Sequence, residues 1–336
     1  MRSVDVMREI GLSDHDDGVC FGLAATTLIS FLLGDEKFKK LQTKHSMIDS
    51  GVITDIKREK LSKYLTRVAL FQAPYLYRNK FPDPKPFFQD IVSVSESKGG
   101  KRLKKAGGLK SVADISGVYS RDDFRDMLLS LSYAARRDPG SAAKRYAMLV
   151  ANETHTVMVG YDSDNRLWFF HDHGVTASYD HDELRGAIKK LYDRLYCNDR
   201  DTLALTLNFY ALGSQLDDAK HVIESWFQRS VMSEMHQIDE EKATFINQDG
   251  FAWIVFAAEN GELDAVRKLL KYSLAAGDEG VRQVEIALWR ASISGQLAVI
   301  DLIVDTAPSI INASGIHFPL HVAAQRGALS TVEKLL

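Results

Sequence analysis

The side chains in this chain that could perform chemistry are a cysteine, a histidine and an aspartate. Cys20 follows a glycine and a valine and opens the apolar run CFGLAATTLISFLL, which predicts a buried helix. The partial positive charge and free N–H groups of a helix N-terminus favour the thiolate, the reactive form of cysteine. Cys20 is therefore a candidate nucleophile, and the alternative is a small buried apolar residue. We expect Cys197, at the end of a helical pattern, to be structural or incidental.

A histidine and an aspartate follow within residues 147–180, a region of β-branched and aromatic segments that predicts antiparallel strands. A hairpin loop centred between Ser163 and Asp164 would place His155 directly opposite Asp172, with both side chains on one face. The carboxylate would then hold one ring nitrogen and leave the other free to take a proton from a thiol. The alternative interpretation is a surface ion pair without a catalytic role.

His171 and His173 flank Asp172, and strand alternation predicts that both point to the opposite face and have structural roles. Two such histidines could chelate a metal together, and the segment Asp14, His15, Asp16 and Asp17 precedes the cysteine. A metal site is the alternative reading. Because the chain has no HExxH or CxxC spacing, we predict neither a metal nor a cofactor.

The C-terminal part of the chain repeats itself. Gly261, Gly295 and Gly327 are 34 and 32 residues apart, and each lies between two short apolar-periodic segments, which predicts stacked helix pairs. The third segment, HFPLHVAAQRG, resembles the ankyrin signature TPLHxAAxxG. In that family a histidine at the position of His321 is structural. Since the sequence stops at Leu336 without a polar cap, we expect further repeats beyond it.

The segments GVCFGL around Cys20, HTVMVGYD around His155 and the aromatic strand before Asp172 resemble the YopT/AvrPphB type of papain-like cysteine protease, over roughly residues 10–180. The resemblance implies that Cys20 is the nucleophile, His155 the base and Asp172 its orienting residue. Here His171 separates Phe170 from the aspartate, and His173 stands where the family commonly has proline.

The predicted fold class is thus an α+β papain-like cysteine protease domain followed by an all-α ankyrin-repeat domain. We expect the protease-like domain over residues 1–202, a helical connector over 203–246 and about three repeats over 247–336. Papain-like enzymes also place a Gln or Asn shortly before the cysteine to bind the oxyanion, whereas GLSDHDDGV has neither and carries Asp14 near that position. Deamidation, another acyl transfer, or an inactive scaffold whose repeats bind a protein therefore remain alternatives to hydrolysis.

Composition limits the remaining possibilities. The chain has 336 residues and a net charge of -3, which gives no general attraction to nucleic acid. Two cysteines are too few for a disulfide framework, and no apolar stretch predicts a signal peptide or a membrane span. The basic segment 98–110 predicts an exposed loop, with contact to an acidic substrate or lipid headgroup as the alternative. The two-domain layout resembles bacterial effectors delivered into host cytoplasm by specialised secretion, where repeats bind the host protein to be modified.

Overall fold

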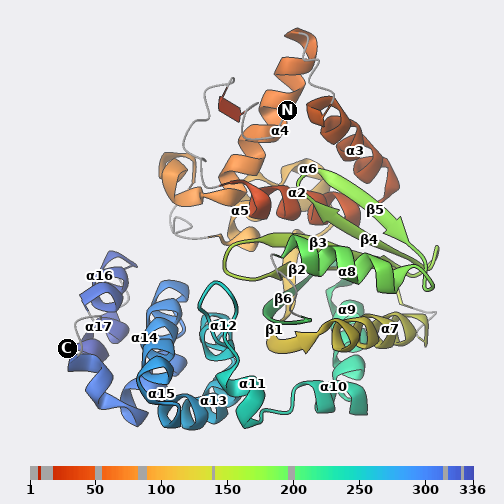
Figure 1. Ribbon diagram of the computed structural model, residues 1–336. Coiled ribbons are helices and arrows are strands. Elements are labelled where there is room, and N and C mark those ends of the chain that lie inside the picture. Colours follow the sequence, from red (N-terminus) through yellow and green to blue (C-terminus); the bar gives the residue numbers. More distant parts are fainter. Residues whose placement is uncertain are drawn as a thin grey trace.

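The computed structural model describes residues 7–8, 18–49, 55–81, 89–137, 141–195, 201–312, 317–326 and 329–336. These residues form a mixed structure of helices and strands, with a six-stranded sheet whose neighbouring strands are all antiparallel. At this coarse level the structure agrees with the predicted α+β class. A helical array follows the sheet in sequence and packs beside it (Figure 1).

The sheet has the strand order β1-β6-β2-β3-β4-β5. Strands β2 to β5 form a meander, whereas β6, the last strand in sequence, inserts between β1 and β2. The strands are β1 (Leu109–Ser120), β2 (Arg145–Ala151), β3 (Thr156–Asp162), β4 (Leu167–Asp172), β5 (Val175–Tyr179) and β6 (Thr202–Leu212).

Helices cover both faces of the sheet. Successive side chains of a strand point to opposite faces, and here both faces carry apolar side chains that need to be buried. Ala147, Leu149 and Met158 pack with the N-terminal helices, which are α2 (Cys20–Leu32), α3 (Asp35–Asp49), α4 (Asp55–Gln72), η1 (Pro74–Lys80), α5 (Ile91–Lys98) and α6 (Gly100–Lys105). Met148 and Val150 face the other way, towards α7 (Arg121–Arg137), α8 (Leu184–Arg194), α9 (Leu216–Phe227) and α10 (Ser230–Met235).

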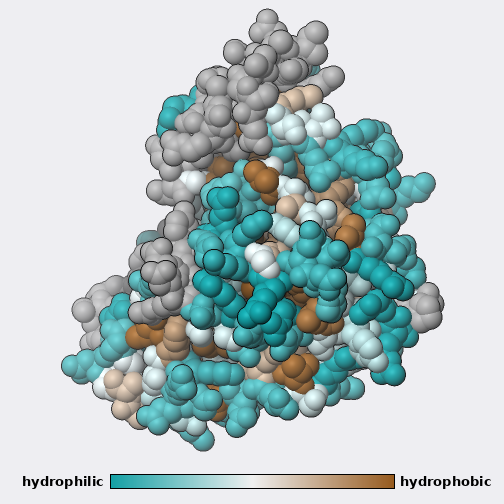
Figure 2. Space-filling view, turned by 45° about the vertical axis from the view of Figure 1, so that its right-hand side comes forward, coloured by the Kyte–Doolittle hydropathy of each residue, from teal (hydrophilic) through white to brown (hydrophobic). Residues whose placement is uncertain are grey.

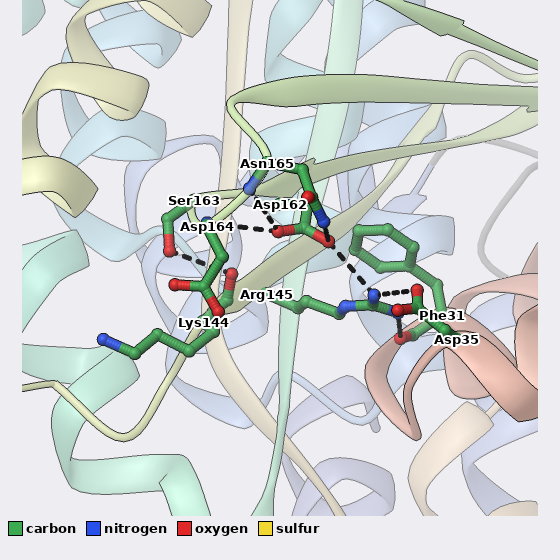
Figure 3. A network of polar contacts seen from close by, with 8 residues as sticks. All are labelled: Phe31, Asp35, Lys144, Arg145, Asp162, Ser163, Asp164 and Asn165. Carbon is green, nitrogen blue, oxygen red and sulfur yellow. Dashed lines mark hydrogen bonds and ion pairs between the residues drawn. The ribbon is translucent and has the colours of Figure 1, made fainter.

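The β3–β4 hairpin has a different register from the one predicted. Met158 pairs with His171, and Asp162 pairs with Leu167, so the turn contains four residues and is centred one residue later than expected. The Asp162 carboxylate explains this, because its Oδ1 accepts hydrogen bonds from the backbone N–H groups of Asp164 and Asn165, each at 3.1 Å (Figure 3). Arg166 completes the turn with a φ of 56°.

Arg145 of β2 ties the C-terminal end of α2 to the same hairpin (Figure 3). Its Nη1 donates to the carbonyl of Phe31 at 2.8 Å, and its Nη2 lies 3.0 Å from Asp162 Oδ2. The guanidinium also pairs with Asp35, the first residue of α3. These contacts hold the helix that begins with Cys20 against strands β2 and β3.

The array consists of helices with glycine turns, as predicted. Gly261 ends α12 and Gly295 ends α14, both with positive φ, a conformation that glycine adopts without steric cost. Gly327 lies outside the described residues. The helical array consists of α11 (Glu240–Thr244), α12 (Trp253–Asn260), α13 (Leu263–Ala275), α14 (Gly277–Ser294), α15 (Leu297–Thr306), η3 (Pro308–Asn312), α16 (His317–Arg326) and α17 (Leu329–Leu335). The short helix η2 (Gly213–Gln215) precedes α9 and lies outside the array.

The array is joined to the sheet by polar and apolar contacts at β1 and β6. Trp253 Nε1 of α12 donates to Ser116 Oγ of β1 at 2.9 Å. The Asn247 side chain both accepts from and donates to the backbone of Ala204 in β6, each at 2.9 Å. Val118 belongs to the same hydrophobic cluster as the array, so sheet and array share a core.

Three predictions about the organisation of the chain are wrong. A domain boundary at residue 202 would cut the sheet, because β6 begins at Thr202 and lies between two other strands. Of the predicted helical connector 203–246, the first ten residues are strand, and α9 and α10 pack on the sheet core. The segment 98–110 is not a loop. It contains α6 and the start of β1, because Leu103 and Leu109 are buried.

On the face shown in Figure 2, hydrophilic residues predominate and the hydrophobic ones form small separate patches. Within the described residues, every helix is too short or too polar to cross a bilayer.

Candidate functional site

Cys20 is the first residue of α2, at the helix N-terminus where the sequence places it. The N-cap residue Val19 supplies no side-chain hydrogen bond, and the first turn carries no acidic residue. Gly22 allows α4 to approach closely, since a Cβ there would lie 2.2 Å from the carbonyl oxygen of Val68. The positive end of the helix is therefore directed at a partly exposed thiol.

His155 is held by a tight connection between β2 and β3, residues 152–155. Asn152 Oδ1 accepts from the backbone N–H of His155 at 2.8 Å and from that of Thr154 at 3.1 Å. Asn152 Nδ2 donates to the Leu195 carbonyl at 2.9 Å. Sequence reasoning missed Asn152, although an Asn that precedes a turn by this spacing is a common turn signal.

The structure brings His155 and Asp172 together, with 2.7 Å between Nε2 and Oδ1. The predicted register placed these two residues directly opposite each other, and in the structure they are not. The observed register is displaced by two residues, and a displacement by two keeps both side chains on the same face, so that they meet diagonally. His155 is 3% exposed, and the interaction is therefore shielded from solvent.

Cys20 and His155 form the second contact of the group. Burial would raise the pKa of the thiol, but the hydrogen bond and charge of His155 and the backbone N–H groups of Thr156 and Phe21 lower it overall. Burial would likewise lower the pKa of His155, yet hydrogen bonds to Asp172 and Cys20 raise it to about 9. Since Nε2 is held by Asp172, Nδ1 is the nitrogen left for the thiol. These opposite pKa shifts favour a thiolate beside an imidazolium over the neutral pair.

His173 does not point away from the site, which corrects the prediction. Strand β4 ends at Asp172, and His173 has a φ of 46°, so strand alternation no longer applies to it. Its ring stacks on that of His155 with centroids 4.6 Å apart, and its Nε2 lies 3.7 Å from Asp172 Oδ1. Burial and the positive charges of His155 and Arg194 lower the pKa of His173, against the opposing effect of Asp172.

His171 lies on the other face, as predicted. Its ring stacks on His45 of α3 with centroids 4.8 Å apart, and its Nδ1 lies 2.8 Å from Thr176 Oγ1. It therefore cannot chelate a metal together with His173. Residues 14–17 and Cys197, which also entered the sequence argument, lie outside the described residues.

A different trio, His155, Asp172 and His173, could hold a metal, because one donor atom from each lies within 4.8 Å of the others. The two imidazole planes are only 29° apart and stacked. The Nε2 atoms of both rings nevertheless approach the same carboxylate oxygen, Asp172 Oδ1, at 2.7 and 3.7 Å. A hydrogen-bonded trio and a metal site are therefore alternatives for this group.

Gln72, the last residue of α4, lies at the nucleophile helix. Its Oε1 accepts from the backbone N–H of Gly22 at 3.0 Å, which satisfies one of the free donors of the helix N-terminus. This contact could not be predicted from the sequence, because 50 residues separate the partners. An amide side chain is thus present at the first turn of α2, although the segment before Cys20 contains none.

A cavity of about 220 Å³ borders Asp172 between strands β4–β5 and helix α8. Its lining is mainly apolar and includes Val157, Phe170, Ala177 and Leu191. The exposed Arg194 lies at its rim, with Nε 3.5 Å from Asp172 Oδ2. The cavity has the size and polarity to accept an apolar side chain.

Comparison of the chain with protein-family models, with curated proteins and with solved structures finds no match in any of the three.

Proposed function

We propose that this protein is a thiol hydrolase in which Cys20 attacks a carbonyl group of a protein substrate. The observation that carries the proposal is the convergence of Cys20, His155 and Asp172 from three separate elements, with a thiol pKa that is lowered and an imidazole pKa that is raised to about 9. Opposite shifts of this kind produce the ion pair that nucleophilic catalysis requires.

In the proposed reaction the Cys20 thiolate forms a bond to the carbonyl carbon of an amide. His155 gives its proton to the leaving nitrogen, the C–N bond breaks, and a thioester remains on Cys20. A water molecule then loses a proton to His155 and attacks the acyl carbon, and the C–S bond breaks. Asp172 keeps the ring oriented through Nε2 in both steps.

The papain-like and ankyrin identities belong to this proposal. A cysteine at the N-terminus of a buried helix, packed on an antiparallel sheet that bears a histidine and an aspartate, supports the resemblance to YopT/AvrPphB-type proteases. Helix pairs with left-handed glycines 34 residues apart at 261 and 295 support the resemblance to ankyrin repeats. Both resemblances concern arrangement, and the chemistry is argued from the site.

In the proposed function, specialised secretion delivers this chain into host cytoplasm. The array then binds a host protein, and the Cys20 thiol modifies that host protein. This part rests on the resemblance of the two-part layout to bacterial effectors. Nucleic acid is a poor candidate partner, because the net charge is -3.

Two alternatives share this geometry. If the leaving group is ammonia from a glutamine side chain, the same steps give deamidation, and if an amine replaces water they give acyl transfer. The absence of a Gln or Asn shortly before Cys20 favours a further candidate, an inactive scaffold whose array binds a protein.

The decisive experiment is the alkylation rate of Cys20 by iodoacetamide between pH 5 and 9, followed by mass spectrometry of the labelled peptide. Cys197 in the same chain is the internal comparison. We expect labelling of Cys20 to persist below pH 7 in the wild type and to be about tenfold slower at pH 6 in His155→Ala. The wild type has the larger thiolate fraction, but a thiolate of lower pKa is also a weaker nucleophile, which partly offsets this advantage. An ordinary thiol profile that is unchanged in His155→Ala would contradict the proposed enzymatic function. The inactive scaffold whose array binds a protein would then be the better candidate.

A further inference from the structure

The turn that carries His155 is also a contact point for the helical array. Thr154 Oγ1 lies 3.4 Å from Oδ2 of Asp249, a residue that lies four positions before the start of α12. The carboxylate of Glu153 pairs with the guanidinium of Arg290 in α14. Two consecutive residues of the turn are therefore held by the array, immediately before His155.

Arg290 is placed to hold the turn firmly. Its side chain is 7% exposed and that of Glu153 is 21% exposed, so the ion pair lies largely out of water. A second carboxylate, Glu259 of α12, lies 3.9 Å from Arg290 Nη1, and the Trp289 ring centre is 4.7 Å from the guanidinium carbon. Removing one partner of such a pair leaves a poorly solvated charge, which is strongly unfavourable.

Within the turn, the Asn152 side chain accepts from the backbone N–H groups of Thr154 and His155 and donates to the carbonyl of Leu195, and the backbone N–H of Asn152 donates to the carbonyl of His155. These bonds shape the turn locally, whereas the contacts of Glu153 and Thr154 set its position against the array. The direction of the His155 ring depends on a backbone that, two residues earlier, is fastened to α14. A small displacement of the ring matters, because Nε2 and Nδ1 must reach Asp172 and Cys20 at the same time.

We propose that Arg290 is a positioning residue for the site: by pairing with Glu153, the helical array holds the 152–155 turn so that His155 contacts Cys20 and Asp172 together. Its effect on catalysis rests on the proposed function, whereas its effect on His155 does not. The array thus has a role inside the chain in addition to the proposed binding of a partner. A displacement of α14 away from the turn would also move His155 relative to Cys20.

The test measures the titration midpoint of His155 by NMR of the full chain labelled at its histidines, together with the pH profile of Cys20 alkylation. Arg290→Met and Glu153→Gln should each lower the His155 midpoint by half a pH unit or more and raise the pH at which Cys20 reacts. The matched control is Arg267→Met, since Arg267 is an exposed arginine in α13, and both midpoints should stay at their wild-type values in it.

The double variant Glu153→Gln with Arg290→Met should shift the midpoint no further than Arg290→Met alone, because both changes break one interaction. If Arg290→Met does not fold, the near-isosteric Glu153→Gln decides. Folded variants that keep the wild-type His155 midpoint would overturn the proposal. If Cys20 behaves as an ordinary thiol in the wild type, the proposed function fails, and the His155 midpoint still tests the positioning role.

Discussion

Two stacked histidine pairs lie at the end of strand β4, and they differ in charge. The site pair is His155 with His173, and the core pair is His45 with His171, with centroid separations of 4.6 and 4.8 Å. In the site pair the pKa of His155 is raised to about 9. In the core pair burial and neighbouring positive charge lower the pKa of His45 to about 4 and that of His171 well below its usual range.

The difference comes from the partners of the rings. His45 Nε2 meets the hydroxyl of Tyr64 at 2.6 Å, and His171 Nδ1 meets that of Thr176 at 2.8 Å. Hydroxyl groups carry no charge, so burial favours the neutral rings. His155 instead meets the carboxylate of Asp172 and the Cys20 thiol. Ring stacking is therefore common to both pairs, and the partners Asp172 and Cys20 account for the raised pKa of His155.

The largest effect should follow from removing the charge of Asp172. Asp172→Asn keeps the shape of the side chain but removes its charge, so the pKa of His155 should fall from about 9 by about one unit or more, as burial is then less opposed. Histidine NMR titration measures this shift. Thr176→Val is the matched control, because it removes a partner of the core pair and should leave His155 unchanged. An unaltered His155 midpoint in Asp172→Asn would show that the carboxylate is not the cause.

The core pair should make the protein less stable in acid. The pKa of His45 is lowered to about 4 in the folded state, so the unfolded chain takes up the proton first. Stability is therefore lost as the pH falls from about 6.5 to about 4, by on the order of 1 to 3 kcal/mol. Urea unfolding at pH 7 and pH 5 measures the loss.

The variant His45→Gln keeps a donor for Tyr64 and removes the titrating ring, so the difference in stability between pH 7 and pH 5 should shrink. His221→Gln is the control, since His221 is an exposed histidine of α9, and it should retain the wild-type difference. Equal pH dependence in wild type and His45→Gln would place the acid sensitivity elsewhere.

The sequence was informative where the signal is local. A glycine before an apolar run located the start of α2 at Cys20, and segments rich in β-branched and aromatic residues between polar breaks located β3 and β4. Side chains along a strand alternate between faces with a period of two residues. A register displaced by two residues therefore still leaves His155 and Asp172 on one face. The displacement itself depends on hydrogen bonds to the Asp162 carboxylate, which composition of the turn does not reveal.

Features that depend on distant partners escaped prediction. Strand β6 has an alternating pattern, yet its place between β1 and β2 requires pairing with Leu109–Ser120, about 90 residues earlier. The pairing of Glu153 with Arg290 spans an even longer separation. His173 enters the site because the chain turns with a positive φ after Asp172, and alternation, which predicted the opposite face, holds only inside a strand.

The smallest effect should come from the outer ring of the site pair. His173→Asn removes the stacked ring and retains a residue that tolerates the positive φ at this position. Because Asp172 and Cys20, and not His173, raise the pKa of His155, its midpoint should rise by only about a few tenths of a unit as one repulsive neighbour is lost. The same variant tests the metal alternative. If the trio of His155, Asp172 and His173 bound Zn²⁺, micromolar Zn²⁺ would slow alkylation of Cys20 in the wild type and not in His173→Asn, whereas a trio that binds no metal predicts that the ion leaves the rate unchanged in both proteins.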